Sequence, residues 1–255
     1  MLILFHAFKR EIAPLRRALG SARAWSVGGF AGFEADLKAT PLFAVRTGPG
    51  PRNAALAAHA TLKRLGRPGA VVVAGVAGGL QAGLQTGQIV LADRLVRAAP
   101  VGVPAQEYRL DGALVERVRQ HLCRAEIRPV IGPVLTADHV IATAREKQLC
   151  AKQTGAVAVE MESAAVAAEC AAQGLRCLCL RAILDRADED VVGGHLLEPG
   201  GSVSARRLLG QLCRRPWVLT SLIALARHLR IAARALAPAL LIALGALDAE
   251  AQNTP

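Results

Sequence analysis

Apolar runs of strand length alternate with Ala-rich stretches of helical periodicity along most of this 255-residue chain. The clearest run, AVVVA at 70–74, is short, β-branched and free of polar residues, which is typical of a strand buried on both faces. This alternation predicts an α/β protein with three layers, α/β/α, around a central mixed, mainly parallel sheet. We expect strands at 2–5, 42–47, 70–74, 88–92, 130–135, 156–159 and 175–184, and helices at 9–19, 53–65, 111–124, 143–152 and 161–173.

The chain after Ser204 differs in character from the chain before it. Arginines become denser, and Pro238 interrupts an apolar stretch of helical periodicity. We therefore expect one domain over 1–204 and a basic, apolar helical extension over 205–255. Two interpretations of the extension stay open, because a basic amphipathic helix can lie on an anionic membrane surface or pack on protein. Its apolar stripe consists of Leu219, Leu222, Ala226, Leu229, Ala233 and Leu236, flanked by Arg227, Arg230 and Arg234.

The composition narrows the class of protein. The chain is 53% hydrophobic and only 3% aromatic with a net charge of +11, so it can bury a large core but has few rings to stack on nucleic-acid bases. Six cysteines occur without a CxxC pair, which is typical of reduced thiols in a cytosolic protein and gives no metal-binding pattern. The apolar N-terminus becomes charged after eight residues, too early for a signal peptide. We predict a cytoplasmic protein with no nucleic-acid partner and no metal.

Two glycine-rich segments follow predicted strands, at the edge of the sheet where open α/β folds bind ligands. In the segment TGPGPRNAA, Gly48 and Gly50 precede a helix whose N-terminal amides could hold an anion or a sugar hydroxyl. In the segment AGVAGGL, Gly75 and Gly78 would let a ligand approach the backbone closely. A plain turn explains either segment equally well when it is considered alone.

Two acidic segments complete the candidate site. The segment VEMESAA places Glu160 and Glu162 where a short strand meets a helix, and residues two apart do not share a helix face, so the two carboxylates should have different roles. The segment LRAILDRADED ends a buried strand at Asp185, which puts a carboxyl group at the mouth of the sheet. The ordinary alternatives are a glutamate that complements a helix dipole and a surface loop of mixed charge.

In order and spacing, the four segments together resemble the nucleoside phosphorylase and nucleosidase superfamily, which includes the 5′-methylthioadenosine/S-adenosylhomocysteine nucleosidases. The resemblance covers roughly residues 1–190, and its most specific parts are AVEMESAAVA and RAILDRAD. The basic tail is similar, more narrowly, to the hopanoid-associated phosphorylases, which act on adenosylhopane.

The resemblance implies a role for each acidic residue. Asp185 matches the general acid that protonates the purine N7, and it must stay protonated near neutral pH to do so. Glu162 matches the carboxylate that binds the ribose hydroxyls, where negative charge suits an oxocarbenium-like sugar. Met161 would pack against the sugar, and Glu11 matches the carboxylate that positions water in the nucleosidases.

The chain also departs from the family pattern. Phosphorolytic members often carry an Arg before the second glycine segment and a Ser within it, where this chain has Val73 and Val76. Arg46 and Arg52 could supply the charge instead. Hydrolysis and phosphorolysis therefore both stay open, with inorganic phosphate as a co-substrate in the second case.

Two further departures concern the base. Leu184 stands where a Ser commonly supports the acid, and Val140 stands where many nucleosidases have a Phe that stacks on adenine. The pocket for the purine is thus expected to be looser than in those relatives, with Val140 as a contact.

The predicted function is cleavage of the N-glycosidic bond of a purine nucleoside, adenosylhopane first, with release of adenine in hopanoid side-chain biosynthesis. The alternative substrate class is that of the methylthioadenosine/adenosylhomocysteine nucleosidases, and the alternative without catalysis is a membrane-peripheral binding protein. We expect no cofactor. If the substrate is adenosylhopane, it is lipid-linked, and we expect peripheral contact with the inner face of the membrane. The family resemblance also implies a homo-oligomer.

Overall fold

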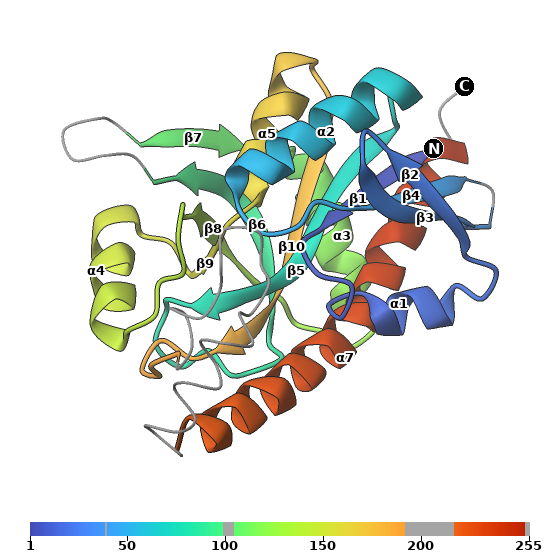
Figure 1. Ribbon diagram of the computed structural model, residues 1–255. Helices are drawn as coiled ribbons and strands as arrows, with labels where there is room; N and C mark the ends of the chain where they lie inside the picture. Colours follow the sequence, from blue (N-terminus) through green and yellow to red (C-terminus); the bar gives the residue numbers. More distant parts are fainter. Residues whose placement is uncertain (39, 99–104, 192–216, 253–255) are drawn as a thin grey trace.

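A ten-stranded sheet forms the centre of the protein, within the residues that the computed structural model describes, which are 1–38, 40–98, 105–191 and 217–252 (Figure 1). Its strands are β1 (Leu2–His6), β2 (Arg23–Val27), β3 (Phe30–Asp36), β4 (Pro41–Arg46), β5 (Ala70–Gly79), β6 (Ile89–Arg97), β7 (Gln106–Arg109), β8 (Val130–Thr136), β9 (Ala158–Glu160) and β10 (Cys177–Asp185). The helices are α1 (Ala13–Ala18), α2 (Pro51–Leu65), α3 (Gly112–Arg124), α4 (Ala144–Thr154), α5 (Ser163–Ala172) and α7 (Trp217–Gln252).

The middle of the sheet is parallel. Strands β10, β5, β1 and β4 are hydrogen-bonded neighbours in that order, and all of them run in the same direction. Antiparallel partners surround this centre: β6 pairs with β10, β9 with the end of β5, and β3 with β4. The carboxyl ends of the four central strands therefore meet at one edge of the sheet, where ligands bind in such folds.

Helices cover both faces of the sheet, because successive side chains of each buried strand point to opposite faces. On β1, Leu2 and Leu4 face the core shared with α1, α3 and α7. Ile3 and Phe5 face the core shared with α2 and α5. The predicted three-layer α/β/α class with a mixed sheet is confirmed.

The structure corrects three details of the expected elements. The first helix begins at Ala13 and not at residue 9, because the segment before it is a loop in which the N–H of Phe8 bonds to the side chain of Glu11. The second glycine segment is not a turn: β5 continues through it to Gly79, paired with β10 up to Gly78. Strands β2, β3 and β7, which the pattern did not predict, add antiparallel pairs at both ends of the sheet.

Helix α7 crosses the face of the sheet that also carries α1 and α3 (Figure 1). Residues Ile223–Glu250 are long and apolar enough to span a membrane, but 61% of the most apolar window is buried within the protein. Ala233 and Leu236 of the expected apolar stripe are buried, Leu236 in the core shared with α1 and α3, whereas Ala226 is exposed. The second half of α7 therefore packs on the core of the protein.

The domain boundary expected at residue 204 lies outside the described residues and stays a prediction.

Candidate active site

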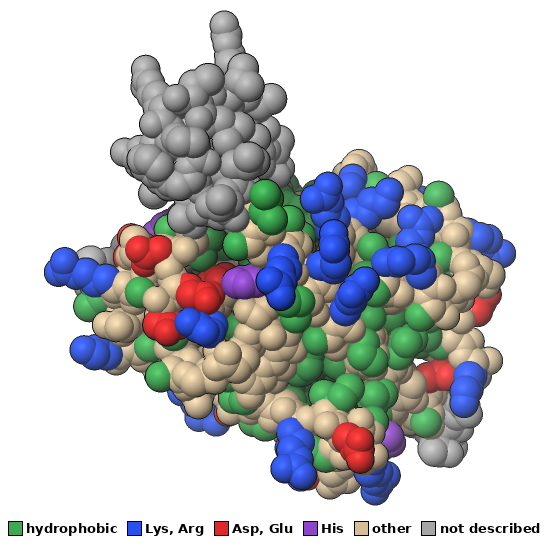
Figure 2. Space-filling view, turned by 90° about the horizontal axis from the view of Figure 1, so that it is seen from below, with side chains coloured by type: hydrophobic (Ala, Val, Ile, Leu, Met, Phe, Trp, Pro, Cys, Tyr) green, Lys and Arg blue, Asp and Glu red, His purple; other side chains and the backbone are tan. Residues whose placement is uncertain are grey.

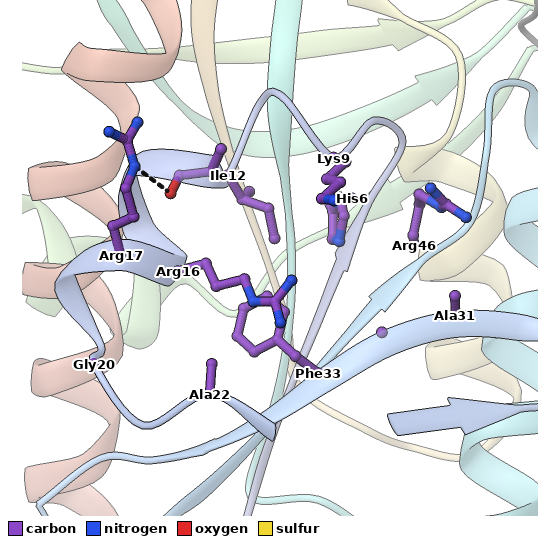
Figure 3. A pocket seen from close by; sticks show the side chains of 12 residues that line it. His6, Lys9, Ile12, Arg16, Arg17, Gly20, Ala22, Ala31, Phe33 and Arg46 are labelled. Atoms are coloured by element: carbon purple, nitrogen blue, oxygen red, sulfur yellow. Dashed lines mark hydrogen bonds between the residues drawn. The ribbon is translucent and has the colours of Figure 1, made fainter. Parts of the chain in front are cut away.

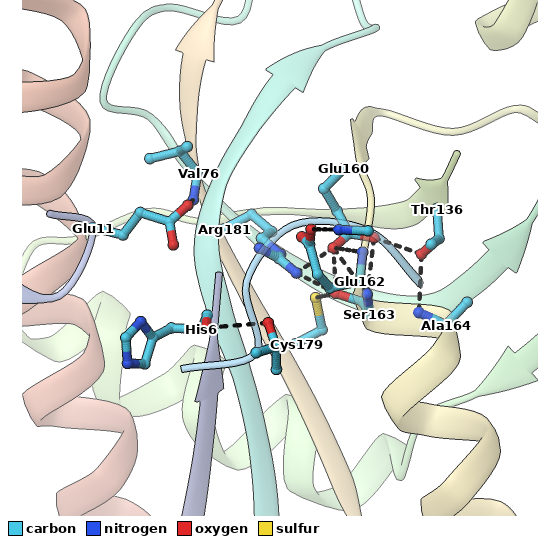
Figure 4. A network of polar contacts seen from close by, with 12 residues as sticks. His6, Glu11, Val76, Thr136, Glu160, Glu162, Ser163, Ala164, Cys179 and Arg181 are labelled. Atoms are coloured by element: carbon cyan, nitrogen blue, oxygen red, sulfur yellow. Dashed lines mark hydrogen bonds and ion pairs between the residues drawn. The ribbon is translucent and has the colours of Figure 1, made fainter. Parts of the chain in front are cut away.

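Three buried acidic side chains, Glu11, Glu160 and Glu162, come together where the central strands end (Figure 4), and a fourth, Asp185, is buried at the same edge of the sheet. Glu11 follows β1, Glu160 ends β9, Glu162 stands at the start of α5, and Asp185 ends β10. The sheet order brings these elements to one edge although they are far apart in sequence. Burial of several carboxyl groups in one place is costly unless each group is paired or protonated. Clusters of buried titratable groups are common in active sites.

Glu160 is fully engaged in holding the protein together. Its carboxylate forms a buried ion pair with Arg181 of β10, and it accepts hydrogen bonds from the backbone N–H groups of Glu162 and Ser163, both at 2.9 Å. The hydroxyls of Thr136 and Ser163 donate to it as well. These contacts fix the first turn of α5 against the sheet. The role of Arg181 is visible only once β9 and β10 are placed.

Glu162 points to a different place from Glu160. Its Oε1 atom accepts a hydrogen bond of 2.8 Å from the N–H of Gly50, in the glycine segment that follows β4. Burial, together with the neighbouring Glu160 carboxylate, raises the pKa of Glu162 to about 8. Gly48 and Gly50 both have positive φ angles, of 75° and 93°, which glycine adopts readily. The first glycine segment thus positions Glu162.

Glu11 lies beside the same cluster. Its Oε2 atom accepts a hydrogen bond of 2.8 Å from the N–H of Phe8, and its Oε1 atom accepts one of 3.2 Å from the N–H of Val76. Burial raises its pKa. A Cβ atom on Gly75 would lie 2.6 Å from Nη1 of Arg181 and 3.0 Å from Oε1 of Glu11. Gly75 is therefore needed for the close packing of these two side chains.

Asp185 forms the second buried ion pair of the site, with Lys147 of α4. The Lys147 side chain has no exposed surface, and its ammonium group also donates to the carbonyl oxygens of Arg186 and Glu189, both at 2.7 Å. Burial raises the pKa of Asp185, and the Lys147 ammonium opposes that rise. Gly78 leaves room for this group, since a Cβ atom there would lie 3.2 Å from Oδ2 of Asp185.

Sequence reasoning missed Lys147. A lysine in a short polar helix is ordinarily exposed. The sequence of α4 gives one weak signal of an unusual packing, which is that the helix lacks an apolar face. In the structure, Lys147 is the only buried residue of α4.

Met161 and Val140 are both half-buried. Met161 lies between the two glutamates. Val140 belongs to the loop before α4, and this loop is hydrogen-bonded to the segment after Asp185, through the N–H of Val191 and the carbonyl of Ala142 at 2.7 Å. Their contacts with a sugar and a base stay predictions.

A cavity of about 240 Å³ opens beside Asp185, bounded by the loop after β10 and by Ala224, Leu225 and His228 of α7. Within the described part of the chain, no group of three or more His, Cys, Asp or Glu residues could hold a metal ion.

The sequence matches the family model described as "Phosphorylase superfamily" over residues 2–201. Two relatives of known name are both 5′-methylthioadenosine/S-adenosylhomocysteine nucleosidases. The protein from Mycobacterium bovis is 30% identical over 217 residues, which cover 72% of this chain and 85% of the relative. The protein from Geobacillus thermodenitrificans is 29% identical over 222 residues, which cover 81% of this chain and 93% of the relative.

A solved structure shows the same fold. The chain superposes on the 5′-methylthioadenosine/S-adenosylhomocysteine nucleosidase of Helicobacter pylori with a TM-score of 0.77, at 20% identity, over 97% of each chain. The match extends over the C-terminal part of the chain as well as over the sheet.

Proposed function

Because the chain belongs to the phosphorylase superfamily, whose family model matches residues 2–201, we propose that it hydrolyses the N-glycosidic bond of adenine nucleosides of the methylthioadenosine and adenosylhomocysteine class. The superfamily predicted from the sequence, and with it the prediction of an enzyme, is thereby confirmed. The nucleosidases among its relatives favour this substrate class, the alternative in the sequence analysis, over adenosylhopane.

The observation that carries the proposal is the meeting of three carboxyl groups with unlike surroundings at one edge of the sheet. Asp185 is held by a buried ammonium group, Glu162 by a glycine amide, and Glu11 by two backbone amides. The raised pKa of Asp185 suits a group that must carry a proton near neutral pH. Pairs of carboxyl groups with separated roles are the usual means of cleaving a glycosidic bond.

In the proposed reaction the bond between C1′ and N9 breaks while Asp185 transfers its proton to N7, so that the purine leaves as a neutral base. Glu162 accepts hydrogen bonds from the ribose hydroxyls. Positive charge that develops on the sugar favours the ionised form of Glu162, whose pKa is about 8 in the free protein. Water then bonds to C1′ and gives a proton to Glu11.

Hydrolysis is favoured over phosphorolysis by the surroundings of Glu11. Phosphate sites are built from Arg or Lys side chains and free backbone amides. Here the N–H of Val76 already donates to Glu11, and the carboxyl group of Glu11 and the guanidinium of Arg181 both lie against Gly75. A carboxylate in this place would repel a phosphate dianion, whereas it can orient a water molecule.

The experiment is an assay of adenine release from methylthioadenosine, with and without inorganic phosphate, in which the sugar product is identified. We expect free methylthioribose at a rate that does not depend on phosphate. A phosphorylated sugar would contradict hydrolysis, and a lack of adenine release from both methylthioadenosine and adenosylhomocysteine would contradict the substrate class.

A further inference from the structure

A second cavity, of about 780 Å³, lies next to the candidate active site on the face of the sheet that carries α1 (Figure 3). Its volume is within the range of small-molecule sites. The walls come from the ends of β1 and β4, from β3, and from α1 with the loop before it. The lining side chains include Ile12 and Phe33, so part of the surface is apolar.

The polar part of this cavity is basic. Lys9, Arg16, Arg17 and Arg46 line it together with His6, and no carboxylate is among its described lining residues. Lys9, Arg16 and Arg46 form no ion pair within the described part of the chain. Figure 2, which views the molecule from below, shows Lys and Arg side chains gathered in one region of this face with few acidic side chains among them.

The guanidinium of Arg16 and the backbone at Arg46 are both held in place. The guanidinium of Arg16 lies over the ring of Phe33, 5.3 Å from its centroid, which orients the group. Arg46 ends β4, and the next residue, Thr47, donates its N–H and its hydroxyl to the carbonyl of His6, at 2.9 and 3.2 Å. Figure 3 shows Arg16, Lys9 and Arg46 around the cavity, whereas Arg17 turns back to bond to the carbonyl of Ala13.

The position of this cavity relative to the carboxyl groups suggests what it binds. Asp185 ends β10, Glu11 follows β1, and Arg46 ends β4; these strands lie in the order β10, β5, β1, β4. Arg46 is therefore three strands away from Asp185, and it is level with Ala74 of β5, whereas Asp185 is level with Gly78. A nucleoside with its purine at Asp185 and its ribose at Glu162 and Glu11 would extend its 5′ substituent toward the basic cavity.

We propose that this cavity binds an anionic group, a carboxylate or a phosphate, at the far end of the substrate's 5′ substituent. The inference rests on the proposed function. Ile12 and Phe33 would contact the apolar spacer of the substituent, and Arg16, Arg46 and Lys9 would bind its oxygen atoms. Neutral His6 completes the wall, because burial lowers its pKa to about 4.

The test uses two adenosine derivatives of nearly equal size, 5′-butylthioadenosine and 5′-(3-carboxypropylthio)adenosine. Their dissociation constants are measured by calorimetry in an Asp185→Asn background, where turnover is slow. We expect the carboxylate to bind at least about tenfold more tightly, and the preference to fall with increasing salt. Equal affinities for the two compounds would overturn the proposal.

Matched variants assign the preference to the cavity. Arg16→Met and Arg46→Met should each reduce the preference by roughly three- to tenfold and leave the affinity for the butyl compound unchanged. Arg128→Met is the control, because Arg128 is exposed just before β8 and does not line the cavity. Lys9→Met replaces either variant if it does not fold. A preference that persists in all the cavity variants would contradict the assignment.

A further experiment with inorganic phosphate distinguishes an anionic group of the substrate from free phosphate as the ligand of the cavity. If inorganic phosphate binds the wild type, with a weaker affinity in Arg46→Met, and lowers the affinity for the carboxylate compound, both compete for this cavity. If phosphate instead accelerates adenine release, it is a co-substrate, and the hydrolysis proposed above is wrong. Cleavage of methylthioadenosine with equal affinities for the two test compounds would refute this inference alone.

Discussion

The protein holds two buried pairs of a carboxylate and a cation within one site, and the two pairs are built differently. Glu160 and Arg181 are almost completely enclosed, with side-chain exposures of 2% and 1%. Lys147 is enclosed as well, but its partner Asp185 keeps 11% of its side-chain surface. In the described residues Oδ1 of Asp185 has no hydrogen-bond partner, whereas both oxygens of Glu160 are bonded to protein.

This difference separates positioning from chemistry. A carboxylate whose oxygens are all bonded to protein has no capacity left for a substrate, so Glu160 can only fix the start of α5. Asp185 is held on one side and open on the other, which is what a proton donor requires. Removing one partner of a buried ion pair generally destabilises the fold strongly, whereas removing a catalytic proton affects mainly the rate.

The largest expected effect is that of Asp185→Asn. The amide oxygen can still accept from Lys147, but the buried ammonium loses its charged partner, so we expect some loss of stability together with the loss of the proton donor. We expect kcat for adenine release from methylthioadenosine to fall by roughly 10²–10⁴-fold, the usual contribution of a positioned acid. The thermal midpoint serves as the control for folding. Retention of more than about a tenth of the wild-type rate would refute the role of Asp185.

The second test replaces each of the two glutamates, in turn, with glutamine. Glu162→Gln should lower kcat/KM by roughly 10²-fold with little loss of stability, because Glu162 bonds to a single amide of the protein and is free to hold the ribose. Glu160→Gln should instead reduce the free energy of unfolding by about 3 kcal/mol, since Arg181 loses its buried partner. Steady-state kinetics and urea unfolding of both variants distinguish the two. Equal losses of activity in the two stably folded variants would show that the roles are assigned wrongly.

A smaller effect is expected from Lys147→Met. Lys147 favours the ionised form of Asp185, so its removal raises the pKa of Asp185 further and makes it a weaker acid. The rate at neutral pH should fall roughly 30-fold, and the alkaline limb of the profile of kcat against pH should move to higher pH.

The control for this variant is Lys152→Met, on the exposed surface of the same helix. A lower rate in Lys147→Met with an unchanged pH profile would mean that Lys147 only ties the loop after Asp185 to α4.

Much of the fold could be predicted because its central strands are strongly patterned. The runs at 70–74 and 175–184 are apolar enough to be buried on both faces, and they are the neighbours β5 and β10. The hairpin of β2 and β3 escaped because its strands are half exposed and mix small, aromatic and charged residues. Strand β5 was expected to end early because glycine is rare within strands, yet here its lack of a side chain admits Arg181 and Glu11.

The site was predictable to a different extent at each residue. The sequence places Glu162 and Asp185 at ends of elements, where side chains reach the edge of the sheet. It contains nothing that pairs Lys147 with Asp185, because the contact joins residues 38 apart through the packing of α4 on a loop. The basic cavity is likewise a product of tertiary structure, since Arg16 and Arg46 come from a helix and a strand far apart in sequence.

The smallest expected effect is a change of stability with pH. The pKa of Glu162 is raised from its ordinary value of 4.5 to about 8, so the folded protein binds this proton more tightly than the unfolded chain does. The resulting stabilisation is complete below about pH 4.5 and is lost as the pH rises to 8. Between pH 6.5 and 7.5 the free energy of unfolding should fall by at most about 1.4 kcal/mol through this group.

Burial also raises the pKa of Glu11 and Asp185, and these two groups change the free energy of unfolding in the same direction in wild type and variant. Urea unfolding of wild type and Glu162→Gln at the two pH values isolates the contribution of Glu162, because glutamine does not titrate. Two curves that fall in parallel would mean that Glu162 is already ionised at neutral pH, and that its charge is balanced by Arg181 alongside that of Glu160.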